Sequence, residues 1–168
     1  IDAVLEGLRG LYQDEIPSSA ACRIVQDADR LDKLGALGVG AFFTKAALRG
    51  RGLLDALTHG LSRELTYSQA APYSMLTDTG RRLAREQAAK TLAFFDDLLK
   101  NLEDWGIASF ERRVIVLEED FRARDGSTLR QLEVTIVMPR VCPQCDTPLA
   151  LRHSRGRGIK CEQLTARF

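Results

Sequence analysis

Three carboxylates stand close together in one short stretch of the chain, at Asp27, Asp29 and Asp32, with Arg30 among them. The surrounding segment, residues 24–40, is largely apolar and contains several glycines, which predicts a helix packed against close neighbours. With about 100° of rotation per residue, Asp29 and Asp32 fall together at the margin of the core face, and Asp27 points elsewhere. The expected core face consists of Ile24, Ala28, Leu31 and Gly35.

A carboxylate at the edge of a core needs a compensating partner, because removing its charge from water costs several kcal/mol. A divalent metal ion is one such partner for Asp29 and Asp32. The alternative partner is Arg30, Lys33 or an arginine of another helix, since ion pairs on helix surfaces are common. The residues alone leave both alternatives open.

A second group with metal-binding chemistry lies near the end of the sequence, at Cys142, Cys145 and Cys161. A C-x-x-C knuckle with a third cysteine on a returning strand supplies three of the four soft ligands that tetrahedral zinc prefers. For the fourth ligand we favour a residue beyond Phe168 over His153, and an incomplete site is a further alternative. Without zinc, the group would be three buried free thiols.

The apolar pattern predicts an α+β protein that is mainly helical. Up to Gly106, apolar residues recur at three-and-four spacing, which is typical of helices. The clearest helix spans Thr79–Trp105, with Thr77 or Thr79 as its starting cap and Gly106 where it ends.

After Gly106 the period changes to two, which predicts a β-hairpin with strands at 113–117 and 132–137. We therefore expect two domains: a helical domain over residues 1–106, and a β-hairpin with a small zinc-ribbon-like module over residues 107–168.

The overall composition sets further limits on function. The chain has 168 residues, 45% of them apolar and 28% charged, and its net charge of +1 gives no global field that would attract nucleic acid or anionic membranes. No transmembrane or signal segment is evident, so no membrane partner is expected. The cysteine pattern favours a reducing, cytoplasmic compartment. The start at Ile1 suggests a processed chain or a fragment.

The segment IVQDADRLDKLGALGVGAFF resembles the last signature block of HD-domain metal-dependent phosphohydrolases, in particular a small bacterial branch of that family. The later segment LTDTGRRLAREQAAKTLAFFDDLLKNLEDW is similar to the helix that closes the domain in the same branch. Together the resemblance covers most of residues 12–105, and it implies a helical HD-like domain that hydrolyses a nucleotide or another phosphoester.

In that family a histidine, an adjacent His-Asp pair and a distant aspartate bind one or two divalent cations such as Mn, Mg or Fe. The metal makes hydroxide available for attack on phosphorus. The resemblance places Asp29 as the distant aspartate, a catalytic metal ligand, with Asp27, Arg30 and Asp32 as neighbours that support the metal or face the substrate.

The histidines of this chain depart from that pattern. The only two, His59 and His153, both follow Asp29, whereas the family's other ligands precede it. The first helices and ligands of an HD domain are therefore expected on another segment or polypeptide.

The segment 141–162 resembles the zinc ribbons at the C-termini of bacterial type IA topoisomerases. It is locally basic, which is compatible with contacts to a nucleic acid backbone. The alternative to the enzyme is therefore a non-catalytic module that binds nucleic acid or a protein through a structural zinc ribbon.

Several other residues could take part in binding or catalysis, but a structural role explains their presence equally well. His59 could face a substrate phosphate or lie in a loop, and Cys22 is expected to be a small buried residue. Several arginines could bind phosphates or belong to solvated helix faces: Arg49, Arg51, Arg81, Arg82 and Arg85.

Overall fold

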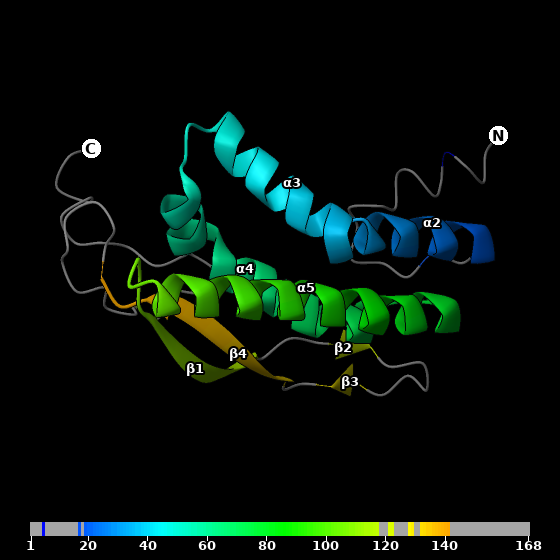
Figure 1. Cartoon of the computed structure of the whole chain (residues 1–168). Helices are drawn as coiled ribbons and strands as arrows, with labels where there is room; N and C mark the ends of the chain where they lie inside the picture. The colour runs from blue at the N-terminus through cyan, green and yellow to red at the C-terminus, as the bar shows by residue number, and fades with distance from the viewer. Residues whose placement is uncertain are drawn as a thin grey trace, which may run out of the picture.

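The computed structural model describes residues 19–117, 121–122, 128–129 and 132–141, together with Leu5 and Pro17. The order of its elements is α2 (Ala20–Leu31), α3 (Gly35–Leu48), α4 (Leu53–Ser74), α5 (Asp78–Asp104), β1 (Phe110–Leu117), β2 (Phe121–Arg122), β3 (Thr128–Leu129) and β4 (Leu132–Pro139). In Figure 1, α5 runs along the middle of the molecule, with α2 and α3 on one side and the β1–β4 sheet on the other. The predicted α+β class, mainly helical with an antiparallel hairpin, is confirmed.

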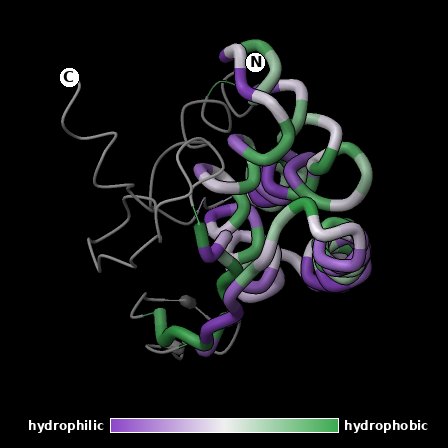
Figure 2. The backbone as a smooth tube through the Cα atoms, turned by 60° about the vertical axis from the view of Figure 1, so that its left-hand side comes forward, coloured by the Kyte–Doolittle hydropathy of each residue, from purple (hydrophilic) through white to green (hydrophobic). Residues whose placement is uncertain are grey.

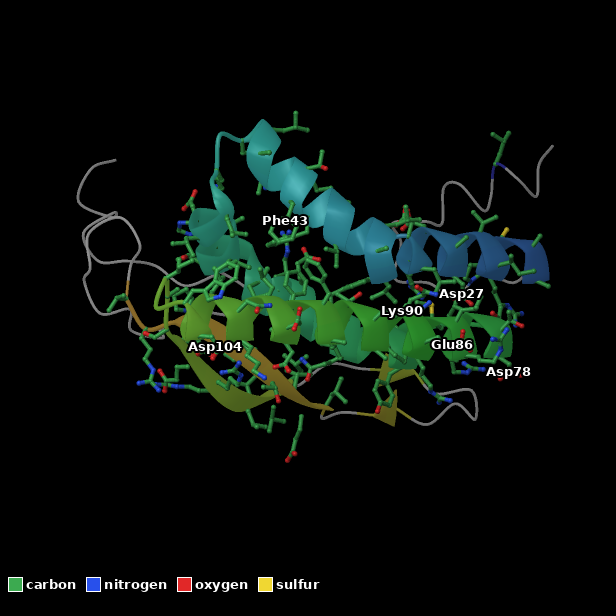
Figure 3. The ribbon with its side chains drawn as sticks, in the orientation of Figure 1. Asp27, Phe43, Asp78, Glu86, Lys90 and Asp104 are labelled. Atoms are coloured by element: carbon green, nitrogen blue, oxygen red, sulfur yellow. The ribbon has the colours of Figure 1, made fainter. Side chains whose placement is uncertain are left out.

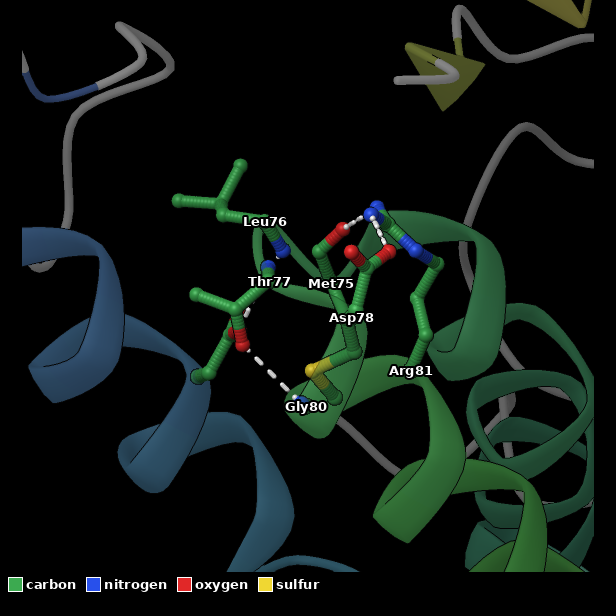
Figure 4. Close-up of polar contacts among 7 residues, drawn as sticks. Met75, Leu76, Thr77, Asp78, Gly80 and Arg81 are labelled. Atoms are coloured by element: carbon green, nitrogen blue, oxygen red, sulfur yellow. Dashed lines mark hydrogen bonds and ion pairs between the residues drawn. The ribbon is translucent and has the colours of Figure 1, made fainter. Parts of the chain in front are cut away.

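The predicted long helix and its boundaries agree closely with α5. Thr77 is the N-cap, and its hydroxyl accepts a hydrogen bond from the backbone N–H of Gly80 at 2.9 Å (Figure 4). A threonine in this position satisfies one of the backbone donors that have no partner in the first turn. At the other end, Gly106 has φ of +65°, the left-handed conformation that commonly ends a helix.

The expectation of one helix over residues 24–40 is wrong, because the chain breaks between α2 and α3. Gly35 has φ of +65°, and its backbone N–H donates to the hydroxyl of Thr91 on α5 at 2.7 Å. The space beside it is also full: a Cβ on Gly35 would lie 2.3 Å from the side-chain oxygen of Gln87. A glycine in left-handed backbone therefore lets the chain turn while it touches α5.

The expected core face is wrong for Ile24 and Ala28, although its other two members, Leu31 and Gly35, do pack inward. Ile24 is 60% exposed and Ala28 is exposed, whereas Gln26 and Asp27 are 3% exposed. Helical spacing shows which residues share a face, but not which face meets neighbouring elements. Here Asp27 meets the residues just before α5, because it finds hydrogen-bond partners there.

The main hydrophobic core lies between α3, α4, α5 and the sheet. Its centre is aromatic: the ring of Phe42 on α3 meets that of Phe95 on α5 edge to face, with 5.5 Å between centroids. Figure 3 shows Phe43 in the same layer, between α3 and α5. Along the helices, hydrophobic residues alternate with hydrophilic ones in the pattern of amphipathic helices (Figure 2). None of the described helices is both long and apolar enough to cross a lipid bilayer.

Strands β1 and β4 pair antiparallel, from Phe110 opposite Pro139 to Leu117 opposite Leu132. Phe110 and Val137 belong to the same core cluster as the helices, so the core continues across the change from helix to strand near residue 106. The turn between the two strands, which the sequence predicts at Asp125-Gly126, lies outside the described residues.

Side chains of α4 bind the backbone of β4. The side-chain amide of Gln69 both accepts from the N–H and donates to the carbonyl of Thr135, each at 2.8 Å. The hydroxyl of Ser62 donates to the carbonyl of Val137 at 2.9 Å. A helix therefore takes the place that a further strand would occupy beside β4.

Candidate functional site

A hollow of about 490 Å³ opens between α3, α4 and the connection from α2 to α3. Its walls carry more cationic than anionic side chains. The cationic residues are Lys33, Lys45, Arg49, Arg51 and Arg63, joined by His59, and the anionic residues are Asp32 and Glu64. We call this set the basic hollow.

Some of this positive charge is neutralised by nearby carboxylates. The pairs are Lys33–Asp29 at 2.7 Å, Arg51–Asp55 at 3.7 Å and Arg63–Glu64 at 3.3 Å. Lys45 and Arg49 have no such partner in the part of the chain that the structure describes, and both are exposed. The basic hollow thus keeps uncompensated positive charge, which favours an anionic ligand.

Asp29 and Asp32 differ in their surroundings. The side chain of Asp29 is 30% exposed, and its Oδ2 pairs with the Lys33 ammonium, which is the ion-pair alternative considered above. Asp32 is exposed and lines the basic hollow. Within the described ranges, no three His, Cys, Asp or Glu side chains come together as a metal-binding group.

Arg30 joins α2 to α4 through both its side chain and its backbone carbonyl. Its guanidinium donates to the backbone carbonyl of Ser74, and its own carbonyl accepts a hydrogen bond from the Tyr67 hydroxyl at 2.8 Å. Burial raises the pKa of Tyr67 to about 12, with a smaller opposing effect from the Arg30 cation and raising effects from nearby carboxylates. This pair fixes the position of the helix that carries Asp29.

Asp27 has a structural role that helical spacing did not indicate. Its Oδ1 accepts from the backbone N–H of Leu76 at 2.8 Å. Its Oδ2 accepts from the backbone N–H of Thr77 at 2.9 Å and from the hydroxyl of the same residue at 2.7 Å. The carboxylate therefore fixes the connection between α4 and α5, and a Cβ on Gly80 would lie only 2.2 Å from it.

The arginines considered at the sequence level separate into two groups. Arg49 and Arg51 line the basic hollow, together with His59. The other three lie on α5, away from it: Arg81 donates to the carbonyl of Met75 and pairs with Asp78 (Figure 4), Arg82 pairs with Glu86, and Arg85 is exposed.

Cys22 is buried, as expected for a small residue in a helix. The proposed zinc ligands Cys142, Cys145 and Cys161, and the alternative ligand His153, lie outside the described residues.

Sequence reasoning did not identify Lys45, Arg63 and Asp55 as parts of a site. Lys45 and Arg63 are single basic residues on two successive helices, and only the packing of α3 against α4 brings them to the same hollow. For Asp55 a signal existed: it precedes His59 by four residues, so both lie on the same side of one helix.

One relative of this chain matches both by sequence and by solved structures. No known protein-family profile matches the chain. The chain is 37% identical over 90 residues to the uncharacterized protein YpgQ of Bacillus subtilis (strain 168), a match that covers 51% of this chain and 42% of YpgQ. The chain thus spans about half the length of this relative.

Solved structures of the same relative also match. The crystal structure of selenomethionine YpgQ from Bacillus subtilis has a TM-score of 0.47 and 32% identity, covering 60% of this chain and 55% of the other. The structure of YpgQ in complex with ADP has a TM-score of 0.47 and 30% identity, covering 60% and 51%.

Proposed function

We propose that this chain is the C-terminal part of an HD-type metal-dependent phosphohydrolase that acts on a nucleotide or a related phosphoester. The observation that carries the proposal is the basic hollow, which lies beside the α2 segment with the DADRLD sequence. In this proposal the hollow binds the phosphate groups of the substrate.

The chemistry of the hollow suits a phosphorylated ligand. Phosphate oxygens need several donors and compensating charge, and guanidinium and ammonium groups supply both. Lys45 and Arg49 are available for this role, since neither has an ion-pair partner within the described residues. A volume of about 490 Å³ is also within the usual range for small-molecule sites.

The relative supports the nucleotide class. YpgQ of Bacillus subtilis, which is 37% identical to this chain over 90 residues, has been crystallised in complex with ADP. A nucleoside diphosphate carries the anionic phosphate groups that the basic hollow favours.

Asp29 is our proposed metal ligand, but the described residues do not by themselves make a metal site. They gather no group of three ligand side chains, and the Asp29 carboxylate is paired with Lys33. In an HD site a divalent ion would supply an activated water. We propose that the remaining ligands come from another segment or polypeptide, and that Arg30 and Asp27 contribute indirectly by fixing α2.

Binding of ADP to the purified chain tests the role of the hollow. In the double variant Lys45→Ala/Arg49→Ala, we expect the affinity measured by isothermal titration to fall about tenfold or more, because two charge-assisted contacts are lost. The control variant is Lys90→Ala/Lys100→Ala, which removes the same charge from exposed positions on α5 (Lys90 is labelled in Figure 3). Equal affinities for both double variants would contradict the proposal.

The ligand role of Asp29 is tested on protein purified with any polypeptide that accompanies it. We expect Asp29→Ala to lose the bound divalent ion and the metal-stimulated hydrolysis of nucleotides, while Asp97→Ala on α5 keeps both. Full metal content in Asp29→Ala would exclude Asp29 as a ligand.

The zinc site through Cys142, Cys145 and Cys161 also remains a proposal. We expect about one zinc per chain by element analysis. Cys145→Ser should release it, and Cys22→Ser should not, because Cys22 is buried in α2, apart from the knuckle sequence.

A further inference from the structure

One carboxylate behind the basic hollow holds two of the side chains that line it. Asp55 lies in the first turn of α4, and its Oδ1 is 3.0 Å from Nε2 of His59. Its other oxygen, Oδ2, is 3.7 Å from Nε of Arg51, in the loop before α4. The two oxygens thus face different partners.

The two side chains that Asp55 holds both face the basic hollow. His59 and Arg51 line it, whereas Asp55 does not. Because Nε2 of His59 faces Asp55, the second ring nitrogen, Nδ1, is left for another partner, and the structure gives it none among the described residues. The His59 side chain is 27% exposed, so a ligand in the hollow can reach it.

The ring is surrounded by charged groups from each neighbouring element. Besides Arg51 and Asp55, those lining the hollow are Asp32, Lys33, Lys45, Arg49, Arg63 and Glu64. The cations outnumber the carboxylates among these groups. An anion bound in the hollow would reverse this balance.

We propose that His59 binds a phosphate group of the ligand as an imidazolium, and that Asp55 is the positioning residue that orients it. The ring takes up one proton from solvent when the ligand binds. It then donates Nε2–H to Asp55 and Nδ1–H to a phosphate oxygen, since both ring nitrogens are donors in the charged form. The inference rests on the proposed function, because it requires a phosphate in the basic hollow.

A purely structural role for Asp55 makes a different prediction. Carboxylates in the first turn of a helix stabilise it through the helix dipole. Asp78 also lies in the first turn of its helix, α5, where it pairs with Arg81 at 2.8 Å, and α5 does not line the hollow. Asp78→Asn is therefore the matched control for Asp55→Asn.

The test compares ADP affinity in the wild type and the variants Asp55→Asn, His59→Gln, their combination, and Asp78→Asn. We expect each substitution at Asp55 or His59 to weaken binding by about three- to tenfold. The combined variant should bind no more weakly than the weaker of the two single variants, because both remove one shared interaction. Asp78→Asn should bind like the wild type.

Nitrogen NMR of the histidine ring gives a readout that a structural role would not change. The chain contains two histidines, so the His59 signals are identified by their loss in His59→Gln. The titration is done at about pH 6.5, near the ordinary pKa of a histidine side chain. There, ADP should move both ring nitrogens of His59 to the protonated form in the wild type. In Asp55→Asn this change should be much smaller.

The outcomes separate the inference from the function on which it rests. Tight ADP binding that neither substitution weakens, with an Nδ1 signal that ADP leaves unchanged, would overturn the inference alone. A wild-type chain that does not bind ADP would overturn the proposed function and the inference together. Should Asp55→Asn prove unfolded by circular dichroism, His59→Gln and the wild-type NMR titration still decide the matter.

Discussion

The start of α5 is anchored by hydrogen bonds from Leu76 and Thr77 to the buried carboxylate of Asp27, beside a small apolar cluster that includes Ala84. Its later turns are anchored by aromatic and aliphatic side chains around Phe95. One helix is thus held by two kinds of interaction. The apolar contacts are many and non-directional, so no single atom is decisive. The polar contacts are few and directional, so each depends on one acceptor atom. Substitutions should therefore affect the two ends differently.

The largest expected effect is at the apolar end. Phe95 is 1% exposed, and Phe95→Ala should lower the free energy of unfolding by about 4 kcal/mol, because it leaves a cavity among Phe42, Leu99 and their neighbours. Urea denaturation measures this loss. The adjacent Phe94, which is 44% exposed, provides the control, and Phe94→Ala should cost much less. Equal losses would mean that the core is not centred on Phe95.

The polar end should respond to a change of a single atom. Asp27→Asn keeps the shape of the side chain but replaces one acceptor oxygen by a donor, so at least one backbone N–H of Leu76 or Thr77 loses its partner. The expected loss is about 2 kcal/mol by urea denaturation. Asp104→Asn at the exposed end of α5 should change stability by less than about 0.5 kcal/mol.

Removing a capping hydroxyl should have a smaller effect. Thr77→Ala should cost about 1 kcal/mol, since the hydroxyl accepts from Gly80 and donates to Asp27. Ser19→Ala removes the cap of α2, whose hydroxyl accepts from the Cys22 backbone N–H at 3.1 Å, and should cost less. A double-mutant cycle of Thr77→Ala with Asp27→Asn should be non-additive, whereas the cycle with Phe95→Ala should be additive.

The polar side of the molecule should also have a pH dependence that the apolar core lacks. Burial raises the pKa of Tyr67 from 10.0 to about 12, so in this range the unfolded chain loses the proton before the folded chain does. Stability should therefore be complete below pH 10 and fall as the pH rises toward about 12. Tyr67→Phe should remove this part of the pH dependence in thermal melts, and Tyr73→Phe, on an exposed residue, should not.

The parts of this fold that the sequence predicts are those with local signals. The cap at Thr77 and the glycine at position 106 mark the ends of α5 within a few residues, because the groups that decide a helix end are neighbours in sequence. The β-branched runs likewise indicate β1 and β4.

The parts that were missed depend on contacts between distant residues. Asp27 accepts its hydrogen bonds from residues 49 and 50 positions further along the chain, and no pattern within α2 reveals them. The same limit applies to the basic hollow, where Lys45 and Arg63 become neighbours only after α3 packs on α4. The break at Gly35 depends on Thr91 of α5 in the same way.

The contact between α4 and β4 has a consequence for how the protein meets other chains. Exposed strand edges attract further strands and are common starting points of aggregation. Both backbone groups of Thr135 are already bound by the side chain of Gln69, and the carbonyl of Val137 is bound by that of Ser62. Because these partners belong to a helix, no foreign strand can pair at these two residues without displacing α4, and this edge of the sheet resists intermolecular growth.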